Sequence, residues 1–381
     1  MVALSYMSVK TKGTVAITRQ DSSRRSRSDG RPTIDDVAAR AGVGAITVSR
    51  ALRSPDLVSP ALRLRIDTAI RELNYVPNSA ASALASSRTD VVGVLLPSLT
   101  HMVFTDVLRG IYDGIDGTKL QVQLANMRYD RQEEERLIAQ FLRQKPAAII
   151  VSGVEQSAKS RRMLETAGCP VVQIMDLSAD PIDQVIGFSH EAAGRRMTEH
   201  LIAQRYRHIA FLSGWLSERS SGRLRGYRQA LAAADLHGVD RVFSIDRARV
   251  ATEPGAPALP ELATPAMGRE LLRQAKSRMP EIDAVFCNND ALALGVLFEC
   301  LAAGIRVPED LGIAGFNDLD VCEAAEPAIS SVRTHRWRIG KEAVAAIRNR
   351  LDGNPPNARI VDVGFDIVQR RSTLRTLTRA D

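Results

Sequence analysis

Residues 33–52 constrain the fold more than any other segment, because they combine two short helical patterns with a glycine between them. The apolar residues at helical spacing are Ile34, Val37, Ala38 and Ala41 in the first pattern, and Val43, Val48 and Leu52 on the expected inner face of the second. Gly42 supplies the turn that ends the first helix. This is the layout of a helix-turn-helix, whose second helix enters the major groove of DNA.

A third helix is predicted to begin at Ser59, because serine is a good N-cap and Pro60 occupies the first helical position without harm. Its apolar pattern continues to Leu73. Residues 78–85 then form an alanine- and serine-rich stretch that is too short for a stable isolated helix. We expect this stretch to become ordered only on DNA.

The order of these segments resembles the DNA-binding head of the lactose/galactose repressor (LacI/GalR) family of transcriptional regulators. In that family the last segment is a hinge helix that folds in the minor groove and inserts a leucine between base pairs. The resemblance matches Leu84 to that leucine, and Asn78 and Ala81 to hinge positions. It implies a double-stranded DNA operator as partner and a homodimer with one head on each chain.

The head residues expected to contact DNA are Thr33, Ala45, Ile46, Thr47, Ser49, Arg50 and Tyr75. Arg50 is the candidate for reading guanine, because arginine pairs with its O6 and N7 atoms, whereas Ala45 and Ile46 suit a thymine methyl group. A phosphate contact is the alternative for Arg50. Gly44 stands where relatives usually carry Ser or Thr; it is an acceptable N-cap, but it brings no hydroxyl group.

The positive charge of the chain is concentrated in its first quarter. Residues 1–89 hold 14 basic and 7 acidic residues, so the net charge of +7 falls entirely on this segment. Such an excess suits contacts with phosphates, although a solvated basic surface is the ordinary alternative. Residues 1–30 are polar, charged and without periodicity, which indicates a disordered tail that either adds non-specific DNA affinity or reflects an over-long reading frame.

From residue 90 onward, strand-like and helical segments alternate. The predicted strands are 91–96, 147–151, 170–175, 208–212, 284–287 and 311–316. The helical segments include 133–142, 191–203 and 291–302. Alternation of this kind predicts an α/β fold with parallel sheets covered on both faces, and ligands that bind beyond the carboxyl ends of the strands.

The family resemblance extends through this region, in runs such as 207–214, 289–295 and 313–318. It implies a periplasmic-binding-protein-like core of two α/β lobes with an effector in the cleft. The expected domains are the tail (1–30), an all-α head (31–77), a hinge helix and linker (78–89) and the effector-binding and dimerisation core (90–381). We expect the N-lobe to hold about 90–187 and 318–352, and the C-lobe about 188–317 and 353–381.

Within the family, runs such as 93–100 and 284–290 are similar to regulators of gluconate-utilisation genes. The resemblance implies that Arg223 binds the effector, that Asp176 accepts a hydroxyl hydrogen bond, and that Asn289 and Asn317 lie in the cleft. Arg219 lies one helical turn before Arg223, so both guanidinium groups can converge on a carboxylate. A repressor released by a sugar acid such as gluconate therefore fits better than one that binds a neutral sugar.

Each of these residues also has an ordinary structural interpretation. Asp176 and Asn317 suit turns, Arg219 suits a surface salt bridge, and Asp290 suits the cap of the following helix as well as it suits a ligand. Phe104 fits the cleft and a contact between subunits equally well.

Two other classes of protein share parts of this pattern. An α/β enzyme is disfavoured, because the common nucleophile-elbow, phosphate-loop and zinc motifs are missing. A catalytic triad of Ser189, His190 and Glu191 is also disfavoured, because consecutive residues at a helix start face different directions. A solute-binding protein of a sugar transporter has the same core but lacks a DNA-binding head. The four separated cysteines indicate reduced thiols, with no metal site and no cofactor. We expect a cytoplasmic protein without a membrane span or a C-terminal coiled coil.

Overall fold

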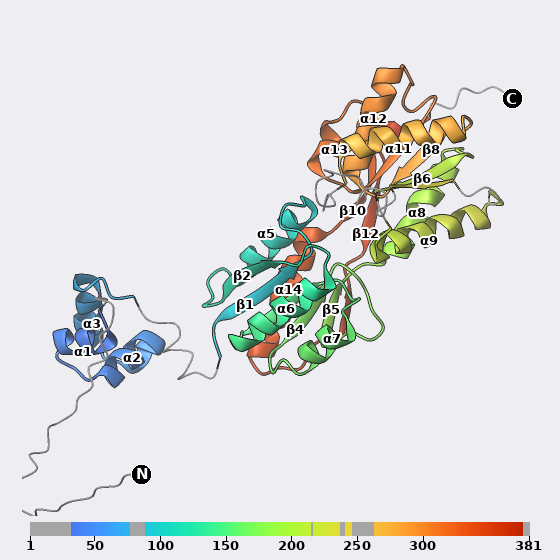
Figure 1. The fold of residues 1–381 in the computed structure, drawn as a ribbon. Helices are drawn as coiled ribbons and strands as arrows, with labels where there is room; N and C mark the ends of the chain where they lie inside the picture. The colour runs from blue at the N-terminus through green and yellow to red at the C-terminus, as the bar shows by residue number, and fades with distance from the viewer. Residues whose placement is uncertain (1–31, 77–87, 215, 237–240, 246–262, 376–381) are drawn as a thin grey trace, which may run out of the picture. The chain divides into compact units, whose positions relative to one another are not determined.

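The computed structural model describes residues 32–76, 88–214, 216–236, 241–245 and 263–375 (Figure 1). The chain divides between Ser82 and Ala83 into two compact units. The predicted tail and the residues of the predicted hinge, including Asn78, Ala81 and Leu84, lie outside the described residues.

The first unit is a small helical domain. It contains α1 (Ile34–Ala41), α2 (Ala45–Arg53), a 3-10 turn η1 (Pro55–Leu57) and α3 (Pro60–Glu72). Thr33 and Asp36 form a capping box at the start of α1, since each side chain meets the backbone N–H of the other residue. Gly42 ends this helix with a left-handed φ of 65°, a conformation that favours glycine.

The core of this unit lies where the three helices meet. Val37, Val48 and Ile66 are fully buried, one from each helix. Leu52 was expected beside Val48, but it is 37% exposed, and Ala51 turns toward the core instead. The prediction for Leu52 is wrong because its position on α2 lies beyond the narrow buried face of a helix this short.

The second unit contains two sheets, and the first of them forms the N-lobe. Its strand order is β11-β5-β4-β3-β1-β2, and all of its pairs are parallel. The strands are β1 (Val91–Leu96), β2 (Gln121–Asn126), β3 (Ala148–Ser152), β4 (Val171–Ile174), β5 (Gln184–Gly187) and β11 (Ile360–Asp362).

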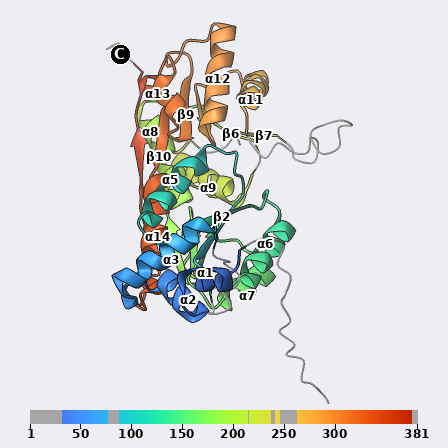
Figure 2. The same ribbon diagram turned by 90° about the vertical axis from the view of Figure 1, so that its left-hand side faces the viewer.

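Helices cover both faces of this first sheet. The helices are α5 (Val103–Ile115), α6 (Arg131–Arg143), α7 (Ala158–Glu165) and α14 (Arg336–Leu351). Val94 packs on the side of α5 and α14, and the next residue, Leu95, packs on the side of α6 and α7. Figure 2 shows these two pairs of helices on opposite sides of the lobe.

The second sheet forms the C-lobe and has the order β12-β10-β9-β8-β6-β7. Its strands are β6 (Ile209–Ser213), β7 (Val242–Ser244), β8 (Ala284–Cys287), β9 (Gly312–Asn317), β10 (Ser330–Thr334) and β12 (Phe365–Val368). The pairing of β10 with β12 is antiparallel, which departs from the predicted all-parallel arrangement.

Helices also cover both faces of the second sheet. The helical segments of this lobe are α8 (His190–Ala203), α9 (Glu218–Ala233), α11 (Pro265–Arg278), α12 (Asp290–Ala303), α13 (Asp320–Ala324) and the turn η2 (Arg371–Thr373). Figure 1 shows α11 and α12 on one side of the sheet and α8 and α9 on the other.

The chain crosses between the lobes at three places, and two of them correct the predicted boundaries. The crossings lie between β5 and α8, between β10 and α14, and between β11 and β12. The boundaries predicted at 318 and 353 are wrong, because β10 stays in the second sheet and β11 returns to the first. Ser330 and Ser331 give β10 no apolar run that would mark it as a strand, although both are fully buried.

Candidate functional site

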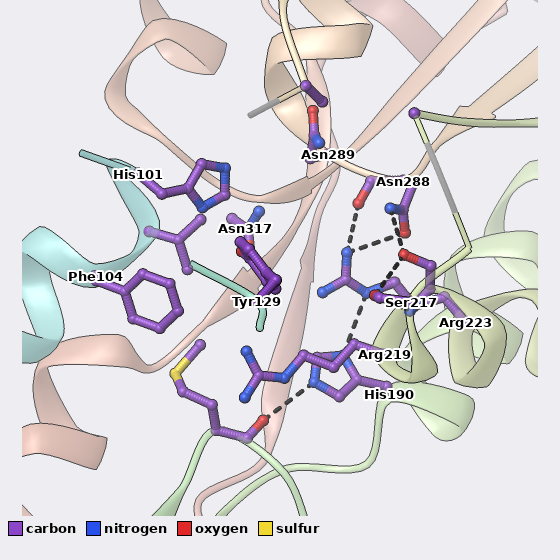
Figure 3. A pocket seen from close by; sticks show the side chains of 15 residues that line it. His101, Phe104, Tyr129, His190, Ser217, Arg219, Arg223, Asn288, Asn289 and Asn317 are labelled. Atoms are coloured by element: carbon purple, nitrogen blue, oxygen red, sulfur yellow. Dashed lines mark hydrogen bonds between the residues drawn. The ribbon is translucent and has the colours of Figure 1, made fainter. Parts of the chain in front are cut away.

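A pocket lies at the carboxyl ends of strands from both sheets, where the topology predicts a ligand (Figure 3). We call it the effector pocket. It is lined by His101, Val103, Phe104, Tyr129, Met175, His190, Gly214, Ser217, Arg219, Ser220, Arg223, Ala263, Asn288, Asn289 and Asn317. The structure thus brings together all the predicted effector residues except Asp176.

Arg223 is the most firmly held cation of this pocket. Its side chain is buried; its Nε donates to Nδ1 of His190 at 3.2 Å, and its Nη1 donates to both the backbone and side-chain oxygens of Asn288. The guanidinium carbon lies 3.6 Å from the centre of the Phe316 ring. Burial, followed by repulsion from Arg219, lowers the pKa of Arg223 to about 9. A bound anion would offset both the desolvation of Arg223 and its repulsion by Arg219.

Helix packing explains how Arg223 reaches this position. Gly194 of α8 lies against the backbone of Arg223, and Gly226 of α9 lies against the backbone of Glu191. A side chain at either glycine would overlap the other helix. The sequence Arg-Leu-Arg-Gly-Tyr therefore places Arg223 on the buried side of α9 because its glycine permits a close helix contact.

Asp176 does not line the pocket but fixes Arg219, which does. Nε of Arg219 donates to Oδ2 of Asp176 at 2.7 Å, and its Nη2 donates to Oγ of Ser152 at 2.9 Å. Burial would raise the pKa of the Asp176 carboxyl, but Arg219 and His190 together hold it below its ordinary value. Asp176 is therefore placed to orient an arginine, and the direct hydroxyl contact expected from the sequence has no support in this geometry.

His190 is a pocket residue that the sequence analysis considered only as part of a catalytic triad. Its Nε2 lies 3.1 Å from the backbone oxygen of Met175 and 3.3 Å from Oδ1 of Asp176, so this nitrogen carries the proton. Its Nδ1 accepts a hydrogen bond from Nε of Arg223 and therefore carries no proton. Burial, followed by the charge of Arg223, lowers the pKa of His190 to about 4.

His101 gives a second sign that the pocket is electropositive. It lines the pocket from the segment before α5 (Figure 3). Burial and the charges of Arg223, Arg219 and Arg336 lower its pKa to about 4. A site that holds two arginines and keeps two histidines neutral is suited to a ligand that brings negative charge.

Asn289, and not Asp290, caps the helix that follows β8. Asn289 is the residue that caps α12, since its side chain accepts from the backbone N–H of Leu292 at 3.0 Å. Asp290 is not the cap; it is fully buried and accepts from Oγ of Ser331 and from the backbone N–H of Leu319. The capping role considered for Asp290 is therefore wrong, and its carboxylate instead connects the segment after β9 to the start of β10.

Asn288, which the sequence analysis missed, contacts both Arg223 and Oγ of Ser220. Asn317 lines the pocket with φ of 112°, a region that few residues other than glycine adopt. Its backbone oxygen accepts from Arg336. A strained, buried asparagine beside a pocket is typical of a functional position.

Aromatic side chains line the N-lobe side of the pocket. Phe104 is buried within a single chain, so the structure places it in the cleft. Tyr129 follows β2 and is 37% exposed, with a left-handed φ of 55°. Nothing in the sequence pattern singled out Tyr129, since it lies in a turn between two polar segments.

The predicted DNA-reading residues occupy the second helix of the first unit. Ile46 is 77% exposed and Arg50 is exposed, whereas Tyr75 packs into the core of this unit. The hydroxyl group of Thr33 is engaged in the capping box. The partly buried members of the predicted set on α2 are Ala45, Thr47 and Ser49. Contacts of all these residues with DNA stay predictions.

Each of the two units matches a known protein family. Residues 33–78 match the model of the lacI family of bacterial regulatory proteins, and residues 198–373 match a periplasmic binding protein-like domain. The chain is 37% identical over 94% of its length to the full length of the HTH-type transcriptional regulator GntR of Pseudomonas aeruginosa. The chain belongs to the LacI family.

Further relatives cover most of the chain. The GntR regulator of Escherichia coli K12 is 37% identical over 88% of this chain and 97% of its own. The crystal structure of a LacI-family regulator from Silicibacter pomeroyi is 33% identical and superposes with a TM-score of 0.80 over 90% of this chain and all of its own.

These relatives settle the class of protein. The chain is a DNA-binding transcriptional regulator and not an enzyme, and family members bind operators and small-molecule effectors and act as dimers. No helix within the described residues is long and apolar enough to cross a membrane. The described part of the chain also holds no group of His, Cys, Asp and Glu side chains that could bind a metal ion.

Proposed function

We propose that this regulator is a repressor that a sugar acid of the gluconate class releases from its operator. The observation that carries the proposal is a pair of arginines in the effector pocket, the buried Arg223 and the partly buried Arg219. Arg223 is the candidate for the carboxylate, because Asp176 already engages Arg219. Ser217, Ser220 and the amides supply hydrogen-bond partners for hydroxyl groups.

We further propose a homodimer that binds a near-palindromic operator, because a two-fold protein requires two-fold half-sites. Large apolar side chains remain exposed on α5 and α12, as expected of an interface between copies. They are Met102 and Tyr112 on or just before α5, and Phe298 and Leu301 on α12. Footprinting should show two symmetric half-sites, and a single half-site bound by a monomer would contradict the proposal.

Titration of a labelled fragment of the DNA upstream of the regulator's own gene tests the effector class. Gluconate should release the protein, whereas glucitol, which keeps the hydroxyl groups but lacks the carboxylate, should not. Equal release by both ligands would show that the carboxylate is not recognised, and release by neither would refute the effector assignment.

A further inference from the structure

The effector pocket continues into a second cavity that lies against the N-lobe. We call this second cavity the annex. It shares Tyr129, Ser217 and Arg219 with the effector pocket, and its remaining walls come from the segments that follow β1, β2 and β3 and from the first turns of α6 and α9. Its volume is about 150 Å³.

The shared wall is rigid. The guanidinium of Arg219 is held by Oδ2 of Asp176 at 2.7 Å and by Oγ of Ser152 at 2.9 Å, and these bonds oppose a rotation that would enlarge the effector pocket. A small acid bound by Arg223 lies on one side of this wall. Any group in the annex lies on the other side and must pass beside Tyr129 and Ser217.

The inner wall of the annex is rich in hydrogen-bond acceptors. Glu134 of α6 is only 5% exposed and shares a hydrogen bond with Gln156. The amide of Gln156 is oriented in turn, because its Nε2 donates to the backbone oxygen of Gly153 at 3.2 Å and its Oε1 accepts from Gln173 at 2.7 Å. Burial raises the pKa of Glu134 to about 7. A ligand that donates hydrogen bonds would stabilise a carboxyl group that is so poorly solvated.

The remaining walls favour a neutral, hydroxyl-rich group. Arg131 and Arg219 border the annex together with the acidic residues Asp130, Glu134, Glu155 and Glu218. Hydroxyl groups suit such a mixed wall, because they can donate to the carboxylates and accept from the arginines. Tyr129 is 37% exposed and offers an aromatic face, on which the apolar face of a sugar ring can pack. An acceptor wall opposite an aromatic ring suits a pyranose, whose edge donates hydrogen bonds and whose face is apolar.

We propose that the annex binds a glycosyl unit joined to the sugar acid, so that the preferred effector is an aldobionic acid, a hexose linked to an aldonic acid. This inference rests on the proposed sugar-acid function. The acid would lie at Arg223 and the hexose at Glu134 and Tyr129.

Calorimetry on the full chain tests the proposal, with gluconate, two hexosyl-gluconates (maltobionate and cellobionate) and the neutral disaccharide maltose. At least one aldobionate should bind roughly tenfold more tightly than gluconate, as one or two added hydrogen bonds provide. Glu134→Gln should remove most of this advantage and leave gluconate affinity unchanged. Glu133→Gln is the matched control, because Glu133 lies on the same helix but is paired with Arg136 outside the annex.

The outcomes separate this inference from the proposed function. If wild type binds gluconate and no aldobionate binds more tightly, the annex is not a glycosyl subsite, although the sugar-acid function stands. Equal losses for gluconate and aldobionate in Glu134→Gln would also overturn the proposal, since Glu134 would then support the whole fold; thermal unfolding of the variant identifies that case. If wild type binds no sugar acid at all, both proposals fail.

Discussion

The two candidate recognition surfaces of this regulator are built in opposite ways. On α2, Ile46 and Arg50 are exposed, and the small core beneath them does not depend on their side chains. In the effector pocket, Arg223 is buried and Arg219 is partly buried, and both are hydrogen-bonded to neighbours before any ligand arrives. Substitutions on α2 should therefore change binding alone, whereas substitutions in the pocket should change both binding and stability.

The largest effect is expected from Arg223→Ala. This change leaves a bound carboxylate without its partner, which typically costs about 2–5 kcal/mol of binding free energy. Calorimetry with gluconate measures the loss. Arg225→Ala is the matched control on the same helix, because Arg225 is exposed and pairs with Glu191. Wild-type gluconate affinity in Arg223→Ala would show that the acid binds elsewhere.

The lowered pKa of His190 should reduce the stability of the core unit when the pH drops from 6.5 toward 4; His101 acts in the same direction, and the raised pKa of Glu134 opposes both. The pKa of His190 is about 4 in the folded protein, below its ordinary 6.5, so the unfolded chain takes up a proton that the folded chain resists. The lowered pKa of Asp176 adds nothing in this range, because its contribution is lost only at lower pH. The loss is on the order of 3 kcal/mol, at about 1.4 kcal/mol for each pKa unit.

Urea unfolding of wild type and His190→Gln across this range measures that slope. The variant should lose less stability than wild type as the pH falls, because the contribution of His190 is gone while those of His101 and Glu134 remain. An unchanged slope in the variant would show that His190 is not held neutral by its surroundings, and would weaken the contrast between a preorganised pocket and an exposed helix.

A smaller effect is expected on α2. Arg50→Ala should weaken operator binding by about 1–3 kcal/mol and leave binding to random DNA nearly unchanged, because base contacts carry specificity and phosphate contacts do not. Unfolding should be unaffected, since Arg50 is exposed. Titrations with both DNAs at one salt concentration decide whether Arg50 contacts a base or a phosphate. Arg63→Ala is the control, because it removes an equally charged, exposed side chain from α3 and not from α2. Equal losses on both DNAs would make Arg50 a phosphate contact.

The smallest effect is expected from Gly44→Ser. Gly44 caps α2 with φ of −81° and ψ of 151°, and a Cβ atom there would meet nothing within 4 Å. A serine hydroxyl can accept from the first turn of the helix, which should stabilise the head by about a few tenths of a kcal/mol. Thermal unfolding measures the gain in stability of the head, and amide exchange in residues 45–53 shows whether α2 is the part that is stabilised. A destabilised head would mean that the glycine is required for the turn itself.

The fold of both units was largely predictable from local signals. Capping residues and apolar spacing located α1, α2 and α3, and continuous apolar runs located β1, β3, β4, β6, β8 and β9. The predictions for the lobe boundaries were wrong because β10 lacks an apolar run and β11 has only three residues. Such strands are defined by their partners, β9 and β5, which no local pattern records.

The pocket was predictable as a set of residues but not as a set of roles. Arg219, Arg223, Asn289 and Asn317 do lie together. Their partners come from distant segments: Asp176 is 43 positions from Arg219, and Asn288 is 65 positions from Arg223. Which polar group satisfies another and which faces a ligand depends on this tertiary pairing. His190, Asn288 and Tyr129 were missed for the same reason.

We propose that operator reading resides in the first unit and effector sensing in the second. Fluorescence anisotropy of the preformed operator complex, titrated with gluconate, tests it most directly in wild type and Arg223→Ala. Both proteins should bind operator equally well, and only the wild-type complex should dissociate, because a ligand shifts the protein only by its differential affinity for two states. Release of Arg223→Ala at the wild-type gluconate concentration would contradict the account.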